Sequence, residues 1–202
     1  MIFDFQQTNP LDRYHLMTQT VTPRPIAWIL TKNDNTTYNL APFSFFSVIS
    51  PDPALLVVSI GNKSDSVQKD TKRNLIREQE CVLHIPSLEQ IHAVNDSAAT
   101  LEYGVSELEN AALSLTSFAP SLPRLKEAKV AMYCRLFELH NVGDSPFSAC
   151  YLEILKLHVD DDIIKQEGDR NIINNAQLNP ISRLGGSDYA VLGKTLTIKR
   201  PN

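Results

Sequence analysis

The stretch NLAPFSFFSVISPDPALLVVSI, residues 39–60, places three phenylalanines and three prolines in a short length of chain. Its second half, residues 54–60, is an apolar and partly β-branched run typical of a strand. Its first half combines the buried-looking APFSFFS with prolines, which restrict the backbone and remove amide donors. Two interpretations follow: a tight corner between two strands, or a pocket built from backbone donors and aromatic faces.

Composition indicates a cytoplasmic protein of one domain. The 202 residues suit a leader over residues 1–20 and a single domain over residues 21–202. Cys81, Cys134 and Cys150 are an odd number, each in an apolar run, which predicts buried free thiols in a reducing compartment. The N-terminus lacks signal-peptide features, and no apolar run approaches the roughly 20 residues of a membrane span. The net charge of −4 argues against a large nucleic-acid surface.

The remaining apolar runs predict mostly strands. They cover residues 26–31, 36–40, 54–60, 81–85, 128–142 and 148–161, and KNDNTT at 32–37 has the composition of a hairpin turn. Alternation fails at Leu136 and Phe137, which favours a β-bulge. Two helices are expected: one from about Asp70, with Val67, Thr71, Leu75 and Ile76 on one side, and one capped by Ser87 and Gln90. This order predicts a mainly β (α+β) antiparallel barrel with peripheral helices and a short helix begun by Pro10.

Two local motifs are candidates for anion binding. The sequence KDT, residues 69–71, lies at a predicted helix start, where free N–H groups, the Thr71 hydroxyl and the Lys69 ammonium would suit a phosphate. An ordinary N-cap at Asp70 explains the same residues equally well. Arg24 stands between two prolines, which would aim its guanidinium, although a solvated arginine at a strand entry is the commoner case.

Other chemistries find no support in the sequence. Neither a Rossmann nor a P-loop glycine motif occurs. Cys81 and His84 would lie on opposite faces of a strand, and the acidic run at 160–162 lacks the spacing of a calcium loop, so no metal site is expected. No serine carries a nucleophile signature.

The motifs PRPIAWILT, NLAPFSFFSVISPDPALLVVSI, KDTKRN, CVLHI and NPISRLGGSDYAVLG, taken in order, resemble the flavin reductase-like family, the flavoredoxin-type FMN-binding split-barrel proteins. The resemblance covers the chain from about residue 20 to residue 193. It implies a six-stranded Greek-key split barrel, a homodimer, and FMN with its phosphate at the helix after the fourth strand. The C-terminal segment would then either fold over the partner's flavin, with Arg183 supplying charge and Tyr189 stacking, or stabilise the dimer without touching a ligand, and the second alternative is slightly favoured.

The resemblance also assigns residues to the cofactor. Lys69 and Thr71 would hold the phosphate, with Arg24 or Ser59 nearby, and Asp70 would cap the helix. The flavin and its ribityl chain would be lined, largely by backbone groups, by Asn39, Ala41, Pro42, Ser44 and Phe45. No catalytic residue is assigned, because the flavin itself carries the hydride chemistry.

Three functions remain open on the sequence. The first is an FMN-dependent oxidoreductase that takes hydride from NADH or NADPH and reduces flavin or another acceptor. The second is an FMN electron carrier, reduced by a partner protein and without a nicotinamide site. The third is a flavin-free barrel that binds another small anion.

Overall fold

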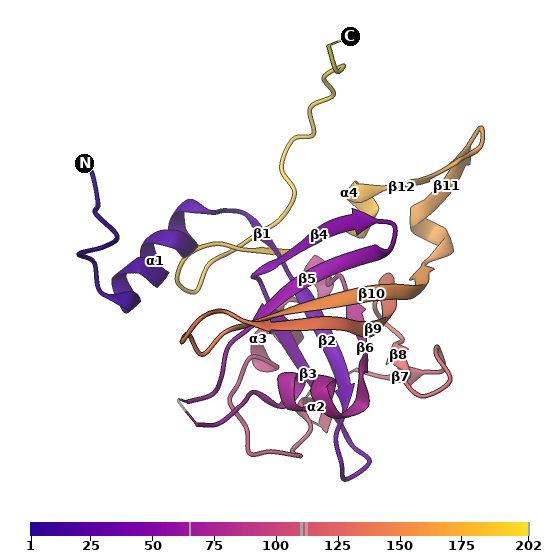
Figure 1. Cartoon of the computed structure of the whole chain (residues 1–202). Coiled ribbons are helices and arrows are strands. Elements are labelled where there is room, and N and C mark those ends of the chain that lie inside the picture. The colour runs from indigo at the N-terminus through magenta and orange to yellow at the C-terminus, as the bar shows by residue number, and fades with distance from the viewer. Residues whose placement is uncertain (65, 110, 112, 202) are drawn as a thin grey trace.

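A computed structural model describes residues 1–64, 66–109, 111 and 113–201 (Figure 1). Its centre is a seven-stranded antiparallel sheet. In spatial order the strands are β3 (Tyr38–Phe43), β2 (Ala27–Lys32), β6 (Glu80–His84), β9 (Val130–Asn141), β10 (Ser148–Val159), β5 (Ala54–Ile60) and β4 (Phe46–Pro51). The mainly β barrel with peripheral helices is therefore confirmed.

The sheet has seven strands where six were expected, because the chain breaks between β3 and β4. Ser44 and Phe45 separate these two strands, which would otherwise be one. The amide of Ser59 on β5 donates to the carbonyl of Phe45 at 2.8 Å, and β3 itself contacts β5. The break thus forms a corner that brings the two ends of the sheet together.

Strand β2 is buried on both faces and separates two cores. Ala27 and Ile29 point into the barrel, where they pack with Val58, Leu83 and other apolar side chains. Trp28 and Leu30 point the other way and pack under the helices and loops of the opposite face. Successive side chains of a strand alternate in direction, so a run that is apolar at every position is buried on both sides. Trp28 is therefore a core residue.

The long hairpin of β9 and β10 carries the expected bulge. Glu138 pairs with Tyr151 and Leu136 pairs with Leu152, so Phe137 has no opposite residue. The three cysteines are buried and no disulfide joins them, as expected. Burial raises the pKa of the Cys150 thiol to about 11.

The helix α2 (Asp70–Glu78) begins where the sequence predicted, but its details differ. Lys69 takes the N-cap position, and Asp70 is the first helical residue, so the expected cap at Asp70 is wrong. Of the predicted apolar side, Val67 and Ile76 are exposed. Thr71 and Leu75 of that side are buried, as predicted. The fully buried Asn74 adds a polar contact, because it donates to Thr31 and Asn33.

The remaining elements surround the barrel. The helices are α1 (Pro10–Thr20), α3 (Ile91–Asp96) and α4 (Asn175–Leu178), with 3-10 turns at Leu88–Gln90, Glu107–Glu109 and Asp161–Ile163. The short strands are β1 (Arg24–Pro25), β7 (Leu115–Thr116), β8 (Arg124–Leu125), β11 (Ile164–Glu167), β12 (Arg170–Ile173), β13 (Ser182–Arg183) and β14 (Tyr189–Ala190). Pro10 starts α1, and the Gln90 side chain accepts the Ser87 amide at 3.0 Å, both as predicted. No helix among the described residues is long and apolar enough to cross a membrane.

Candidate functional site

Two adjoining cavities lie where β3 meets its corner. The larger has a volume of about 340 Å³ and the smaller about 90 Å³. Pro42 and Ala98 line both of them. The stretch 39–60 therefore provides both a corner and a pocket wall. The turn that ends β3 exposes the last residues of this strand to the two cavities.

The smaller cavity lies at the N-terminus of α2. Lys69, Asp70 and Thr71 line it from the helix, and Asn39 and Ala41 line it from β3. The first N–H groups of a helix have no partner within the helix and carry its positive dipole end. Asn39 is buried and donates to the Thr71 hydroxyl oxygen at 2.9 Å, so it fixes the orientation of Thr71.

Charges of both signs meet in the smaller cavity. Lys63 pairs with Asp70 at 2.7 Å, which leaves Lys69 as the cation at the helix start that no ion pair engages within the described chain. Burial, and then the charge of Lys63, lowers the pKa of Lys69. The buried Glu107 accepts the Leu40 amide at 2.8 Å, and burial raises the pKa of its carboxyl above the ordinary value. Two lysines and two acids therefore line this cavity, and an anion bound at the helix start would adjoin Lys69.

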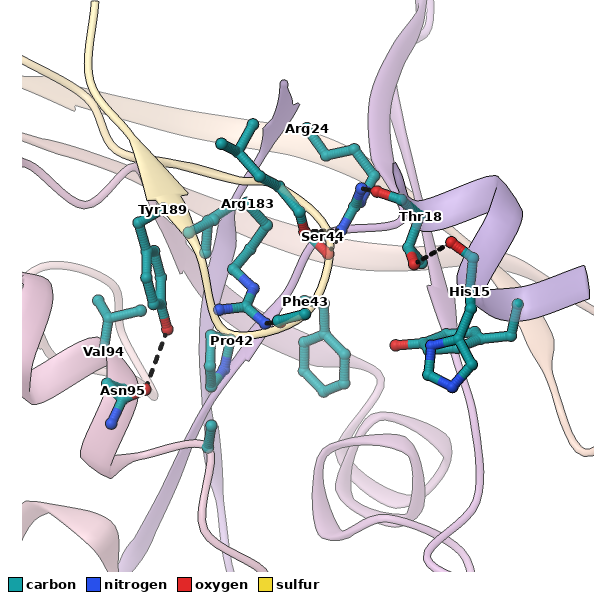
Figure 2. A pocket seen from close by; sticks show the side chains of 15 residues that line it. His15, Thr18, Arg24, Pro42, Phe43, Ser44, Val94, Asn95, Arg183 and Tyr189 are labelled. Carbon is teal, nitrogen blue, oxygen red and sulfur yellow. Dashed lines mark hydrogen bonds between the residues drawn. The ribbon is translucent and has the colours of Figure 1, made fainter. Parts of the chain in front are cut away.

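The larger cavity is enclosed by four parts of the chain (Figure 2). Pro42, Phe43 and Ser44 form the barrel side. The other sides come from α1, α3 and the segment of β13 and β14, through Tyr14, His15, Val94, Asn95, Arg183 and Tyr189. These elements are far apart in sequence, so only the folded chain forms this cavity.

Arg24 ties these parts together. Its guanidinium donates to the carbonyls of Thr18 and Val21 at the end of α1, and to the carbonyl of Leu184 at 2.9 Å. It also lies 3.4 Å from the Ser44 hydroxyl. Burial lowers the pKa of Arg24, and the charge of Arg183 acts in the same direction. The prolines on either side do aim this side chain, but at carbonyl groups.

The structure brings most of the expected cofactor residues together, with three exceptions. Asn39, Ala41, Pro42, Lys69 and Thr71 line the smaller cavity, and Pro42 and Ser44 line the larger. Arg24 lines the larger cavity and not the smaller one, which Lys69 lines.

Phe45 and Ser59 are the other two exceptions, since they line neither cavity. Phe45 stacks on Phe147, with ring centroids 6.1 Å apart. Ser59 points away from the barrel interior because its neighbours Val58 and Ile60 on β5 point inward. Phe45 is part of the corner, and Ser59 contacts it from β5 through the hydrogen bond between its amide and the Phe45 carbonyl.

Several lining residues carried no local signal in the sequence. Lys63 and the segment 97–101 reach the smaller cavity from loops, and Glu107 reaches it from a 3-10 turn. Tyr14 and His15 reach the larger cavity from α1. A helix begun by Pro10 was expected within residues 1–20, but nothing in the sequence indicated that this helix would line a cavity. No group of three or more His, Cys, Asp or Glu among the described residues could hold a metal ion.

Comparison with known proteins places this chain in a family. It matches the model of the flavin reductase like domain over residues 18–172. It is 37% identical to the uncharacterized protein YwrF of Bacillus subtilis, across 100% of this chain and 99% of that protein. The structure of nitrilotriacetate monooxygenase component B from Bacillus cereus superposes with a TM-score of 0.89 at 32% identity, covering 98% of each chain. The chain belongs to the flavin reductase-like family.

A more distant structure shares the fold. The FMN-binding protein from Thermus thermophilus superposes with a TM-score of 0.74 at 16% identity, over 98% of this chain and 100% of that one. The family that this chain belongs to is described by its flavin reductase like domain. A flavin cofactor and an oxidoreductase activity are therefore the function class of this chain.

Proposed function

We propose that the chain binds FMN across the two cavities, with the phosphate in the smaller and the flavin ring in the larger. The observation that carries this is the junction of the cavities at Pro42 and Ala98, which joins an anion site at a helix start to a wider, partly apolar pocket. Lys69 and Thr71 would hold the phosphate together with the free amides of α2. Pro42, Phe43 and Ser44 would face the ring.

The proposed reaction is the NAD(P)H-dependent reduction of a flavin or of another acceptor. The bound flavin would supply the hydride chemistry, so the chain has to bind and orient its ligands and exclude water. No protein acid or base is assigned to it. Arg24 would act as a positioning residue, because its hydrogen bonds keep α1 and the segment near Leu184 against the Ser44 corner.

Anaerobic spectroscopy of the purified protein tests this function. We expect a yellow protein with FMN at one per chain, and bleaching of the flavin band on addition of NADH or NADPH. A colourless protein whose melting temperature FMN does not raise would contradict flavin binding. A flavin that stays oxidised with both nucleotides but is reduced by a partner protein would replace the reductase with an electron carrier.

We also propose that the chain functions as a homodimer. Val48 on β4 and Leu157 on β10 are 77% and 55% exposed, and Phe137 on β9 is 50% exposed. The C-terminal tail carries exposed Leu196 and Ile198 and extends away from the barrel (Figure 1). Large exposed apolar side chains such as these suit a surface that another chain covers.

A further inference from the structure

The larger cavity has an unbalanced charge. Fifteen residues of the described chain line it, and these include Arg24, Arg183 and His15 but no aspartate or glutamate. The smaller cavity, by contrast, balances Lys63 and Lys69 with two carboxylates. A cavity lined by cations and no acid attracts a negatively charged ligand.

Of the two arginines, Arg24 already uses its guanidinium in hydrogen bonds that stabilise the fold. It is 8% exposed, and its guanidinium donates to three backbone carbonyls. A second role for this side chain would break the contacts that hold α1 in place. The charge that remains for a ligand is therefore that of Arg183.

Arg183 is held in place but keeps most of its donors. Its guanidinium lies over the Tyr189 ring, 4.5 Å from the ring centroid, and donates to the carbonyl of Gly186 at 2.6 Å. Tyr189 is fixed in turn by its hydroxyl, 3.4 Å from the Asn95 side chain (Figure 2). A guanidinium has five N–H donors, and one that is already oriented loses little entropy on binding a planar anion.

We propose that Arg183 forms a second-substrate subsite in the larger cavity and binds the carboxylate or phosphate of the molecule that exchanges electrons with the flavin. This inference rests on the proposed FMN function. It extends that function by naming an anion-bearing second substrate and the residue that recognises it. The smaller cavity, at about 90 Å³, has no room for a second substrate beside a phosphate. Tyr189 orients Arg183 and acts as a positioning residue.

The test is ligand binding to the FMN-loaded protein, followed by the flavin difference spectrum and by calorimetry. Benzoate probes a carboxylate-bearing acceptor, and adenosine diphosphate probes the phosphates of a nucleotide donor. Benzamide and adenosine are their neutral counterparts. We expect one of the anions to bind, its neutral counterpart to bind at least tenfold more weakly, and Arg183→Gln to weaken the anion at least tenfold.

Matched variants separate recognition from folding. Arg183→Lys keeps the charge and should restore part of the affinity for the anion. Arg170→Gln removes an exposed arginine on β12 and should leave the affinity for the anion unchanged. The melting temperature of Arg183→Gln should stay close to that of the parent protein.

Each outcome decides the inference. Binding of benzoate alone identifies a carboxylate on the acceptor, and binding of adenosine diphosphate alone identifies the donor's phosphates. Failure of both anions to bind, or equal binding by Arg183→Gln and the parent protein, would overturn the subsite. If the protein holds no FMN yet binds an anion through Arg183, the subsite stands and the proposed function fails.

Discussion

In the proposed FMN site, Lys69 is the residue that we expect to contact the phosphate most directly. It is the N-cap of α2 and lines the smaller cavity, and its ammonium lies 5.6 Å from the centre of the Phe43 ring. Burial makes its charge costly without an anion, as the lowered pKa indicates. A bound phosphate would supply the missing counter-charge.

Replacing Lys69 with alanine should therefore weaken FMN much more than riboflavin, which lacks the phosphate. A lost charge-assisted contact of about 1.5–3 kcal/mol corresponds to a Kd for FMN that rises roughly 10- to 100-fold. Fluorescence titration of the apoprotein with both ligands measures the difference. Lys194→Ala, on the exposed tail, is the control and should bind both as the parent does. Equal losses for FMN and riboflavin would show that Lys69 does not contact the phosphate.

His84 makes stability depend on pH. It is fully buried, its Nδ1 donates to the Trp28 carbonyl at 3.0 Å, and its Nε2 accepts the Leu125 amide at 3.1 Å. Burial lowers its pKa to about 4. The unfolded chain takes up a proton at this site below about pH 6.5, and the folded chain does so only near pH 4. His84 therefore costs stability as the pH falls through this window.

We expect this residue to remove about 2 kcal/mol of unfolding free energy between pH 7.5 and pH 5. Urea unfolding at the two pH values should show a smaller decrease for His84→Gln than for the parent protein, although the variant is less stable at pH 7.5. His92→Gln, on the surface of α3, is the control. An unchanged pH dependence in His84→Gln would mean that His84 does not titrate as a buried neutral imidazole.

At the scale of elements, the larger cavity depends on how α1 is attached. The helix lies beside the barrel (Figure 1), and Thr18 near its end is buried. Arg24 joins that end of α1 to the carbonyl of Leu184 in the closing segment. The two sides of the cavity are thus linked through one guanidinium.

Arg24→Met keeps the length of the side chain and removes those hydrogen bonds. We expect a loss of about 2 kcal/mol in unfolding free energy, because buried carbonyls lose a charged donor. Limited proteolysis should cut Arg24→Met within residues 1–23 sooner than it cuts the parent protein. The control variant Arg170→Met should be cut at the same rate as the parent protein. Unchanged protection of α1 would show that its apolar contacts alone hold it.

At the scale of the whole molecule, the proposed homodimer makes a testable prediction. A dimer should have twice the mass of 22.6 kDa in light scattering after size exclusion. Val48→Asp adds a charge to the exposed β4 surface and should shift the protein toward the monomer at micromolar concentration. Val142→Asp, at the tip of the β9 and β10 hairpin, is the matched control. A dimer that withstands Val48→Asp would place the interface elsewhere.

The pattern of apolar residues by itself determined most strands of the large sheet and their order of appearance, with the exception of β4. The bulge at Phe137 followed from the point where alternation fails. The helix start near Asp70 was equally readable, since a polar, proline-free segment follows a strand. These features depend on neighbours in sequence, so sequence reasoning could find them.

Tertiary structure decided which of these residues meet. Lys63 reaches the smaller cavity from a loop and Glu107 from a 3-10 turn, and His15 and Arg183 reach the larger one from opposite ends of the chain. Asn74 also could not be placed from the sequence, because its buried hydrogen bonds to Thr31 and Asn33 form only where α2 covers the β2–β3 hairpin. Long-range contacts depend on the closure of the whole barrel and leave no local pattern. The stretch at 39–60 therefore predicted a corner and a pocket wall, and only the folded chain showed which charges face that wall.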